Sequence, residues 1–319
     1  MKRVLVIACQ SQTGQLDRVV ESIAGPLRDD PAIAMDYVLL APVSRHPFPW
    51  PFMQFFNTFP ETVYEQPIPL MPLGMPQDQS YDLVILAYQV WFLSPPPVLS
   101  SFLAGPDAPG VLRDCPIVTI IACRNMWLMA QEAVKEHLES LGARLIDNVV
   151  LVDPAHSAAT FISTPLLLLT GRRGPFLGGL VPEAGISERD IVDARRFGLA
   201  IRAGLPSLER EAPKSMLAGL GAVTINERLI ASEVIAKRSF KLWGRLLMTI
   251  GGPASGLRRV ALCFYIAFLL AMILTVVPVS AVVKSLVGLV TKDRIARQRA
   301  YFGAPSGEDR SLIKGYSIE

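Results

Sequence analysis

The sequence has little of what metal sites and disulfide frameworks require. It contains four cysteines and three histidines in 319 residues, with no Cys-x-x-Cys pair and no histidine partner near a cysteine. This spacing argues against zinc and against disulfides. It predicts that Cys9, Cys115, Cys123 and Cys263 are small, buried apolar residues.

Charged residues are also scarce. They make up 18% of the chain, against 51% hydrophobic residues and a mean hydropathy of +0.37. This composition is too apolar for an ordinary soluble enzyme, so part of the chain is expected to contact lipid. The formal net charge of +3 is too small to indicate nucleic-acid binding. Met1-Lys2-Arg3 leads straight into an apolar run, so no signal peptide is expected, and the main domain is placed on the cytoplasmic side of the inner membrane.

The most informative stretch is the first turn, Ser11-Gln12-Thr13-Gly14-Gln15. It joins the apolar run 4–9 to a helical pattern over 16–27. It lacks both the Lys-Ser/Thr ending of a Walker loop and a Gly-x-Gly-x-x-Gly motif. A buried strand, a loop with hydroxyl groups and a helix N-terminus together form an anion cradle, and the expected anion is a phosphate. The alternative is an ordinary turn with Ser or Thr as the helix cap.

Five apolar segments alternate with helical patterns, at about 3–9, 35–40, 82–88, 117–122 and 148–153. They predict an α/β fold with a doubly wound, five-stranded parallel sheet of order 2-1-3-4-5, which is flavodoxin-like, over residues 1–205. Ligands of such sheets bind beyond the carboxyl ends of the strands. The loops after the first, third and fourth strands should therefore converge on one crevice.

Two of these loops resemble those of flavin-binding proteins. The first turn resembles the flavodoxin phosphate loop, which implies that residues 11–15 bind the phosphate of FMN; Leu16 departs from the pattern, where Thr or Asn is usual. The loop Gln89-Val90-Trp91-Phe92 resembles the flavin-ring loop of flavodoxin-like NAD(P)H:quinone reductases. That resemblance implies contacts of Gln89, Val90, Trp91 and Phe92 with the isoalloxazine ring, with Trp91 or Phe92 stacking on it. A core tryptophan is the alternative.

The loop after the fourth strand, Cys123-Arg124-Asn125, is expected to complete the cofactor site. Arg124 is its cation, which could stabilise negative charge on reduced flavin or on a substrate enolate, or could instead form a helix-capping ion pair. Asn125 is either a hydrogen-bond donor to substrate or a helix cap. His156 follows the fifth strand, so it is the histidine predicted to transfer protons near neutral pH, with a structural role as the alternative.

Two apolar regions remain. Residues 46–60 hold six Phe and Trp rings where a polar connection would be usual, which suggests either a lid or membrane-docking surface beside the flavin or a loop packed on its own rings. Residues 206–319 are expected to form a helical, membrane-associated extension, with a helix over 215–250. Its apolar segment, about 260–290, is divided by Pro278, has basic residues at both ends and is long enough to span a membrane. A bent interfacial hairpin with both ends cytoplasmic fits these flanks better than one straight span, and a buried core helix is the alternative.

Taken together, residues 11–16, 48–52 and 123–127 and the lipophilic C-terminal region resemble the bacterial dialkylresorcinol condensing enzyme or aromatase family. Members are encoded beside ketosynthases of dialkylresorcinol, flexirubin and aryl-polyene biosynthesis. The resemblance implies an FMN-dependent aromatase that acts on a lipophilic small molecule after the ketosynthase. Carbon–carbon condensation is not expected, because the sequence has no Cys-His-Asn or Cys-His-His ketosynthase constellation.

The implied chemistry is an oxidation. Conversion of a dialkylcyclohexane-1,3-dione into a dialkylresorcinol removes two hydrogens, which FMN and a base can accept as hydride and proton. Arg124 would favour the enolate, and His156 or a tyrosine would be the base. A membrane-bound NAD(P)H:quinone reductase and a non-catalytic partner that anchors a ketosynthase stay open as alternatives. A homodimer is suggested only by analogy with quinone reductases of this fold.

Overall fold

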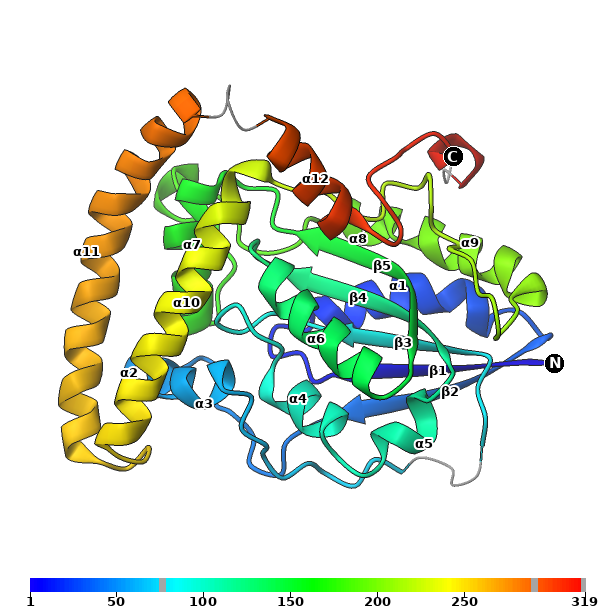
Figure 1. The fold of residues 1–319 in the computed structure, drawn as a ribbon, viewed down its shortest axis with the longest axis horizontal. Coiled ribbons are helices and arrows are strands. Elements are labelled where there is room, and N and C mark those ends of the chain that lie inside the picture. Colours follow the sequence, from blue (N-terminus) through cyan, green and yellow to red (C-terminus); the bar gives the residue numbers. More distant parts are fainter. Residues whose placement is uncertain (75–78, 288–291, 317–319) are drawn as a thin grey trace.

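The sheet domain has the predicted topology. The computed structural model describes residues 1–74, 79–287 and 292–316. Its parallel strands are β1 (Lys2–Cys9), β2 (Ile33–Leu40), β3 (Leu83–Tyr88), β4 (Pro116–Cys123) and β5 (Arg144–Val152), arranged β2-β1-β3-β4-β5 (Figure 1). This order is flavodoxin-like, so the predicted fold class is confirmed. Four strands begin earlier than predicted, β1 and β4 by one residue, β2 by two and β5 by four.

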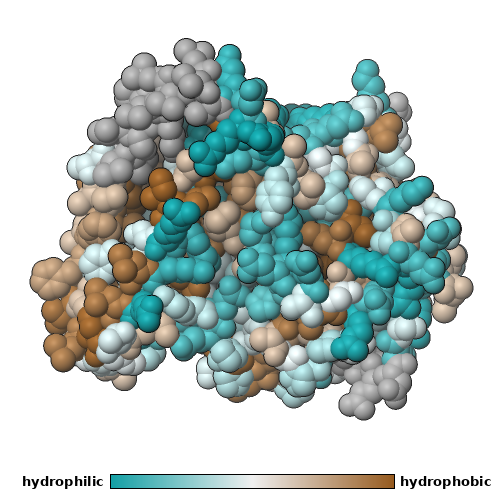
Figure 2. Space-filling view, viewed as in Figure 1, coloured by the Kyte–Doolittle hydropathy of each residue, from teal (hydrophilic) through white to brown (hydrophobic). Residues whose placement is uncertain are grey.

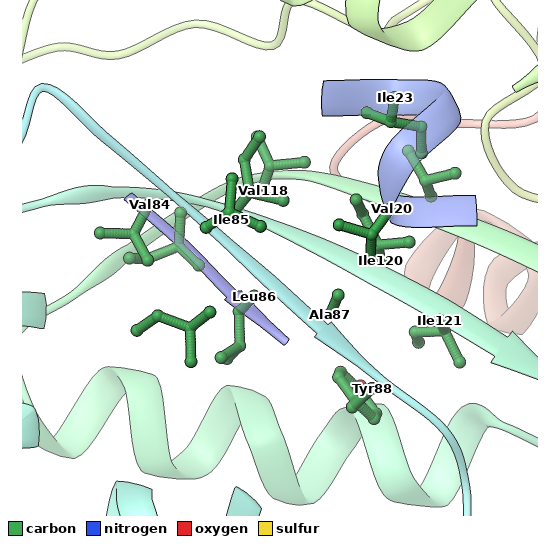
Figure 3. Close-up of a cluster of buried hydrophobic side chains, with 14 of the residues drawn as sticks. Val20, Ile23, Val84, Ile85, Leu86, Ala87, Tyr88, Val118, Ile120 and Ile121 are labelled. Carbon is green, nitrogen blue, oxygen red and sulfur yellow. The ribbon is translucent and has the colours of Figure 1, made fainter. Parts of the chain in front are cut away.

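The strands form because their apolar runs are covered on both faces. Residues 4–9 of β1 and all of β3 are buried, as expected for parallel strands between two helical layers. Figure 3 shows Val20 and Ile23 of α1 (Gln15–Arg28) beside Ile120 of β4. α9 (Arg195–Gly204) packs along α1 so closely that a Cβ on Gly198 would lie 2.0 Å from the carbonyl oxygen of Ile23. Glycine is therefore required at this crossing.

The other face of the sheet carries α4 (Pro97–Leu103), α5 (Ala108–Leu112) and α6 (Leu128–Ser140) (Figure 1). The sheet domain closes with two helices, α8 (Glu188–Asp193) and α9. Ser187 caps α8, because its Oγ accepts a hydrogen bond from the backbone N–H of Asp190 at 3.1 Å. α7 (Ser157–Thr170) follows β5 directly.

The C-terminal region is mostly helical. α10 (Glu227–Ile250) and α11 (Gly256–Val287) form a long antiparallel hairpin at the left of Figure 1, and α12 (Lys292–Gly303) returns to the sheet. α11 continues through Pro278, and residues 288–290 of the predicted apolar segment lie outside the described residues. The helix predicted over 215–250 is wrong for 215–226. Residues 216–220 form bends and a turn, and residues 221–226 run without regular structure beside the sheet edge, where the N–H of Val150 donates to the carbonyl of Ala222 at 2.8 Å. The division into residues 1–205 and 206–319 stays a prediction.

A buried carboxylate fixes both flanks of this hairpin to β5. Asp147 accepts hydrogen bonds from Ser215 Oγ (2.6 Å) and the N–H of Met216 (2.7 Å) before the hairpin, and from Ser306 Oγ (2.8 Å) after α12. Burial raises the pKa of Asp147, and these donors oppose the rise. The segments that precede and follow the hairpin are therefore both hydrogen-bonded to β5.

The aromatic segment forms two short helices, α2 (Phe52–Asn57) and α3 (Phe59–Val63), and residues 47–51 are not helical. These helices build a second core with α10 and α11, in which the stacked rings of Phe59 and Tyr265 are 4.8 Å apart. Arg258, at the start of α11, is 1% exposed and bonds both carboxylate oxygens of Glu61 (2.5 and 2.6 Å) and the Asn57 carbonyl (2.7 Å). The aromatic segment is thus the surface on which the hairpin packs.

The cysteine prediction is confirmed in part. Cys9 and Cys115 are buried and Cys123 is partly buried, but Cys263 is exposed. The prediction is wrong for Cys263 because this residue lies on the part of α11 that faces away from the second core.

Candidate functional site

The first turn has the geometry of an anion cradle. Its last residue, Gly14, has a φ of 73° and precedes α1 without any side-chain cap, so the alternative of a Ser or Thr cap does not hold. Within the described part of the chain, no group accepts a hydrogen bond from the backbone N–H groups of residues 11–15. The loop therefore presents unpaired donors at the positive end of a helix dipole, where anions bind.

The cradle adjoins a pocket of about 260 Å³. This volume is slightly below the roughly 300–1,000 Å³ that is usual for small-molecule sites. Its walls come from the loops after β1, β2 and β3: Gln10, Ser11, Gln12, Pro42, Arg45, His46, Phe48, Gln89, Trp91, Pro96, Pro97 and Val98. The loops after β1 and β3 therefore form the crevice as predicted. The loop after β2 forms its third wall, in place of the predicted loop after β4.

Trp50 joins the aromatic segment to the cradle. Its indole Nε1 donates to Gln12 Oε1 at 2.7 Å, and its ring stacks on His46 and meets Trp91 edge-on, with centroids 5.1 and 5.7 Å apart. Trp50 is 2% exposed. The aromatic segment is thus packed against the cradle, and its residues His46 and Phe48 line the pocket.

Two polar atoms at the pocket lack partners among the described residues, Gln89 Oε1 and His46 Nε2. The Gln89 side chain is held by its Nε2, which donates to the Gln10 carbonyl at 2.9 Å. Burial lowers the pKa of His46 below its ordinary value of 6.5, so its imidazole is neutral at pH 7. Unpaired buried polar groups are costly, and here they are available to a ligand.

The predicted ring loop ends in a tight turn. Trp91 and Ser94 exchange backbone hydrogen bonds of 3.0 and 2.9 Å, and Phe92 and Leu93 between them have φ values of 49° and 58°. Two consecutive positive φ values are characteristic of a type I′ turn. Trp91 lines the pocket, whereas Phe92 packs on Phe55 in the second core, with ring centroids 5.0 Å apart. Val90 packs against the main core. Of the two predicted stacking residues, only Trp91 is therefore placed to stack.

The loop after β4 does not line this pocket. Arg124 is directed to α7: its Nε donates to Thr160 Oγ1 at 2.7 Å and its guanidinium lies 4.1 Å from the ring centroid of Phe161. Burial lowers its pKa to about 10, so it remains charged at neutral pH. Neither Cys123 nor Asn125 lines the pocket. Trp127 occupies the N-cap position of α6, and no side chain caps this helix. The capping role that was the alternative for Asn125 is therefore not observed.

His156 also lies apart from the pocket. Its Nδ1 accepts a hydrogen bond from the N–H of Ala158 at 3.2 Å, so it caps α7, and it is exposed. This is the structural role that the sequence left open as the alternative. Its role in catalysis stays a prediction.

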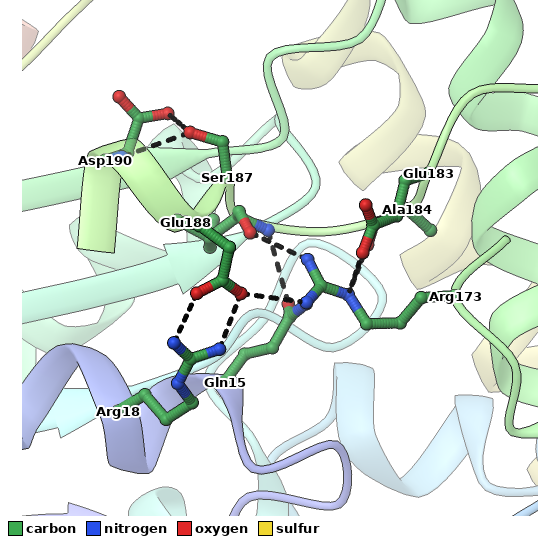
Figure 4. A network of polar contacts seen from close by, with 9 residues as sticks. Gln15, Arg18, Arg173, Glu183, Ala184, Ser187, Glu188 and Asp190 are labelled. Carbon is green, nitrogen blue, oxygen red and sulfur yellow. Dashed lines mark hydrogen bonds and ion pairs between the residues drawn. The ribbon is translucent and has the colours of Figure 1, made fainter. Parts of the chain in front are cut away.

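The side chain of Gln15 is used for structure rather than for the cradle. Its Oε1 accepts a hydrogen bond from the N–H of Ile186 at 3.3 Å (Figure 4). Arg173 holds the same segment through the carbonyls of Ala184 (3.1 Å) and Ile186 (2.9 Å), and also pairs with Glu188, which in turn pairs with Arg18 of α1. This network ties residues 173–188 to the start of α1 and so supports the cradle from behind.

The hairpin carries an exposed apolar surface, which we call the hairpin face. Figure 2 shows hydrophobic side chains gathered over α10 and α11 at the left of the molecule. The exposed members are Ile235, Leu242, Leu246, Leu257, Val260, Phe264, Phe268, Leu270 and Leu274, and exposed basic residues lie among them at Arg238, Lys241, Arg245 and Arg259. Residues Gly256–Thr275 have a mean hydropathy of 2.1 and are long and apolar enough to cross a membrane by length and composition.

Comparisons with known proteins do not identify a family for this chain. No protein-family model matches the chain, and a search of the curated proteins finds no match. Similar solved structures include a flavoprotein in complex with FMN from Lactobacillus acidophilus NCFM, with 14% identity, coverage of 47% of this chain and 93% of that chain, and a TM-score of 0.38. A flavodoxin, WrbA-like protein from Agrobacterium tumefaciens has 12% identity, coverage of 65% and 99%, and a TM-score of 0.37. A flavone reductase has 12% identity, coverage of 67% and 65%, and a TM-score of 0.35. At these identities and TM-scores the strand order itself remains the evidence for the flavodoxin-like fold.

Proposed function

We propose that this protein is an FMN-dependent oxidoreductase. The observation that carries the proposal is the loop of unpaired N–H donors, residues 11–15, at the start of α1, beside a pocket lined by Trp91. The N–H groups and the hydroxyls of Ser11 and Thr13 would hold the phosphate, and Trp91 would contact the ring. Gln89 Oε1 and His46 Nε2 offer polar contacts in the pocket. When bound, FMN supplies a hydride acceptor.

The finer proposal is oxidative aromatisation of a lipophilic cyclohexanedione-type intermediate to a dialkylresorcinol or a related aryl lipid. The substrate loses one hydride and one proton, and its ring becomes aromatic. His46, rather than His156, is the histidine at the pocket, and it is neutral at pH 7, so we infer that it holds the proton. Arg124 contacts α7 instead of the pocket, so its predicted action on an enolate finds no support in this arrangement.

We further propose that the hairpin face lies in the interface of the inner membrane on its cytoplasmic side. Apolar side chains with exposed arginine and lysine among them are the pattern of a helix bound to anionic lipid. Both flanks of α11 are bound to Asp147 of one sheet, through Met216 and Ser306. A straight span by α11 would place these flanks on opposite sides of the membrane. Interfacial binding is therefore the mode that these contacts support, and it would bring a lipophilic substrate to the aromatic segment.

The first experiment is the visible absorption spectrum of the full chain purified in detergent, with the released chromophore identified, followed by titration with FMN and with riboflavin. We expect FMN to bind at least tenfold more tightly than riboflavin, because riboflavin lacks the phosphate. Thr13→Asp should abolish this preference, since it adds a negative charge to the cradle, while Thr224→Asp at an exposed site should not. A colourless protein that ignores added FMN would contradict the proposal and favour a non-catalytic partner of a ketosynthase.

Substrate class and membrane binding need separate assays. Anaerobic mixing with a cyclohexane-1,3-dione bearing alkyl chains should bleach the flavin and give the resorcinol, whereas rapid reduction by NAD(P)H with quinone turnover would contradict the aromatase proposal. The protein should sediment with vesicles that contain anionic lipid, and a smaller fraction of it should sediment with neutral vesicles. Lys241→Glu should weaken this binding, and Arg202→Glu, on the exposed side of α9, should leave it unchanged.

A further inference from the structure

Two charged residues on the inner side of α10 hold two loops of the sheet domain. Lys237 Nζ donates to the carbonyl of Leu93 at 3.0 Å and to Ser94 Oγ at 2.5 Å, in the turn after β3. One helical turn earlier, Glu233 Oε1 accepts a hydrogen bond from the N–H of Met129 at 2.7 Å, in the first turn of α6 after β4. Lys237 thus faces the sheet domain, whereas its neighbour Arg238 is exposed on the hairpin face.

The turn that Lys237 contacts needs such support. Phe92 and Leu93 both have positive φ values, which side chains other than glycine rarely adopt. Leu93 and Ser94 are buried, so the Leu93 carbonyl would lack a partner without the lysine. Burial lowers the pKa of Lys237 to about 8, and three nearby acidic side chains, Glu65, Glu136 and Glu233, partly offset this effect. The contact therefore gives the buried Leu93 carbonyl a hydrogen-bond donor and places the buried ammonium beside hydrogen-bond acceptors and acidic side chains.

We propose that Lys237 is a positioning residue for the flavin ring, because it fixes the turn from Trp91 to Ser94 so that Trp91 faces the pocket while Phe92 is held in the second core. Glu233 fixes the start of α6 in the same way. This inference rests on the proposed function, since it concerns the cofactor of that site. It makes α10 part of the cofactor site although no residue of α10 lines the pocket.

The test combines hydrogen exchange with flavin titration on the full chain in detergent. Lys237→Met should raise the exchange rate of amides in residues 89–96 at least tenfold, and Ser94→Ala, which removes one acceptor and keeps the fold, should raise it less. Arg238→Met, the exposed neighbour on the same helix, should change nothing. Exchange in β1 should stay the same in all three variants. This arm needs no flavin.

In the titration, Lys237→Met should lower the affinities for FMN and for riboflavin by the same factor, at least tenfold, because the turn holds the ring and not the phosphate. The positioning role is overturned if Lys237→Met lowers the affinity for FMN alone. It is also overturned if amide exchange over residues 89–96 rises while the affinity for neither flavin changes. Unchanged exchange over 89–96 in both Lys237→Met and Ser94→Ala overturns the inference as a whole. If the unmodified chain binds neither flavin, the proposed function fails and the flavin part of the inference fails with it, while the exchange arm still shows whether Lys237 holds the turn.

Discussion

Glu233 should make the stability of the protein fall as the pH rises from acid to neutral. Its side chain is fully buried, and burial raises its pKa from the ordinary 4.5 to about 7, although hydrogen bonds from the N–H groups of Met129 and Leu128 oppose the rise. Between these two pH values the native state therefore binds more protons than the unfolded state, and the free energy of unfolding falls with pH. At 1.36 kcal/mol for each pH unit, the fall attributable to Glu233 is about 3 kcal/mol.

The measurement is urea unfolding of the full chain in a non-ionic detergent, followed by circular dichroism, at several pH values from 4 to 8. Glu233→Gln keeps an oxygen for the Met129 N–H but cannot ionise, so its free energy of unfolding should gain about 3 kcal/mol relative to the parent across this range. Glu139→Gln, at an exposed site on α6, is the matched control and should run parallel to the parent. Parallel curves for Glu233→Gln as well would refute the reasoning.

Three further predictions concern the aromatic segment and the hairpin. Arg258→Met should lower the free energy of unfolding by about 3 kcal/mol, because it leaves the partly buried Glu61 carboxylate unpaired; a double-mutant cycle with Glu61→Gln measures the coupling, and a value near zero would contradict it. Trp50→Phe keeps one aromatic ring but removes the hydrogen bond to Gln12 and the second ring of a buried indole, and should lower the free energy of unfolding in urea by at least about 1 kcal/mol; an unchanged free energy of unfolding would contradict this. Cys263 should react with a maleimide in detergent-free solution and be protected by anionic vesicles, as mass spectrometry of the labelled chain can show; equal labelling with and without vesicles would argue against membrane contact there.

The sheet and the cradle could be predicted because their signals are local. Apolar runs mark the strands, and a glycine with hydroxyl residues between strand and helix marks the turn at residues 11–15. The stretch 215–226 was expected to be helical, but Gly219 and Gly221 within it have φ values of 85° and 59°, which a right-handed helix does not allow. The edge of β5 also offers hydrogen bonds that a helix would forgo, as the bond between Val150 and Ala222 shows. Local pattern could not reveal this partner.

The composition of the site was harder to predict because it depends on distant contacts. Arg124 lies at the expected strand end, but α7 supplies Thr160 and Phe161, which turn it away from the pocket. Lys237 reaches a turn 144 residues earlier in the chain, and a basic residue in a helix is ordinarily assigned to solvent or lipid. His46 could have been favoured by its place beside Trp50 in the aromatic segment, since a histidine among rings is easily buried.

The turn from Trp91 to Ser94 has a consequence for any attempt to isolate the sheet domain. Each of its two non-glycine residues with positive φ costs about 1–2 kcal/mol, and the compensation comes from Lys237 and from the packing of Phe92 in a core that α10 and α11 help to build. A chain shortened to residues 1–205 would lose Lys237 and the part of the second core that α10 and α11 supply, and it would leave Asp147 without Ser215, Met216 and Ser306. Engineers who graft the domain onto other anchors should therefore transfer α10 with it, because Lys237 and the second core hold this turn.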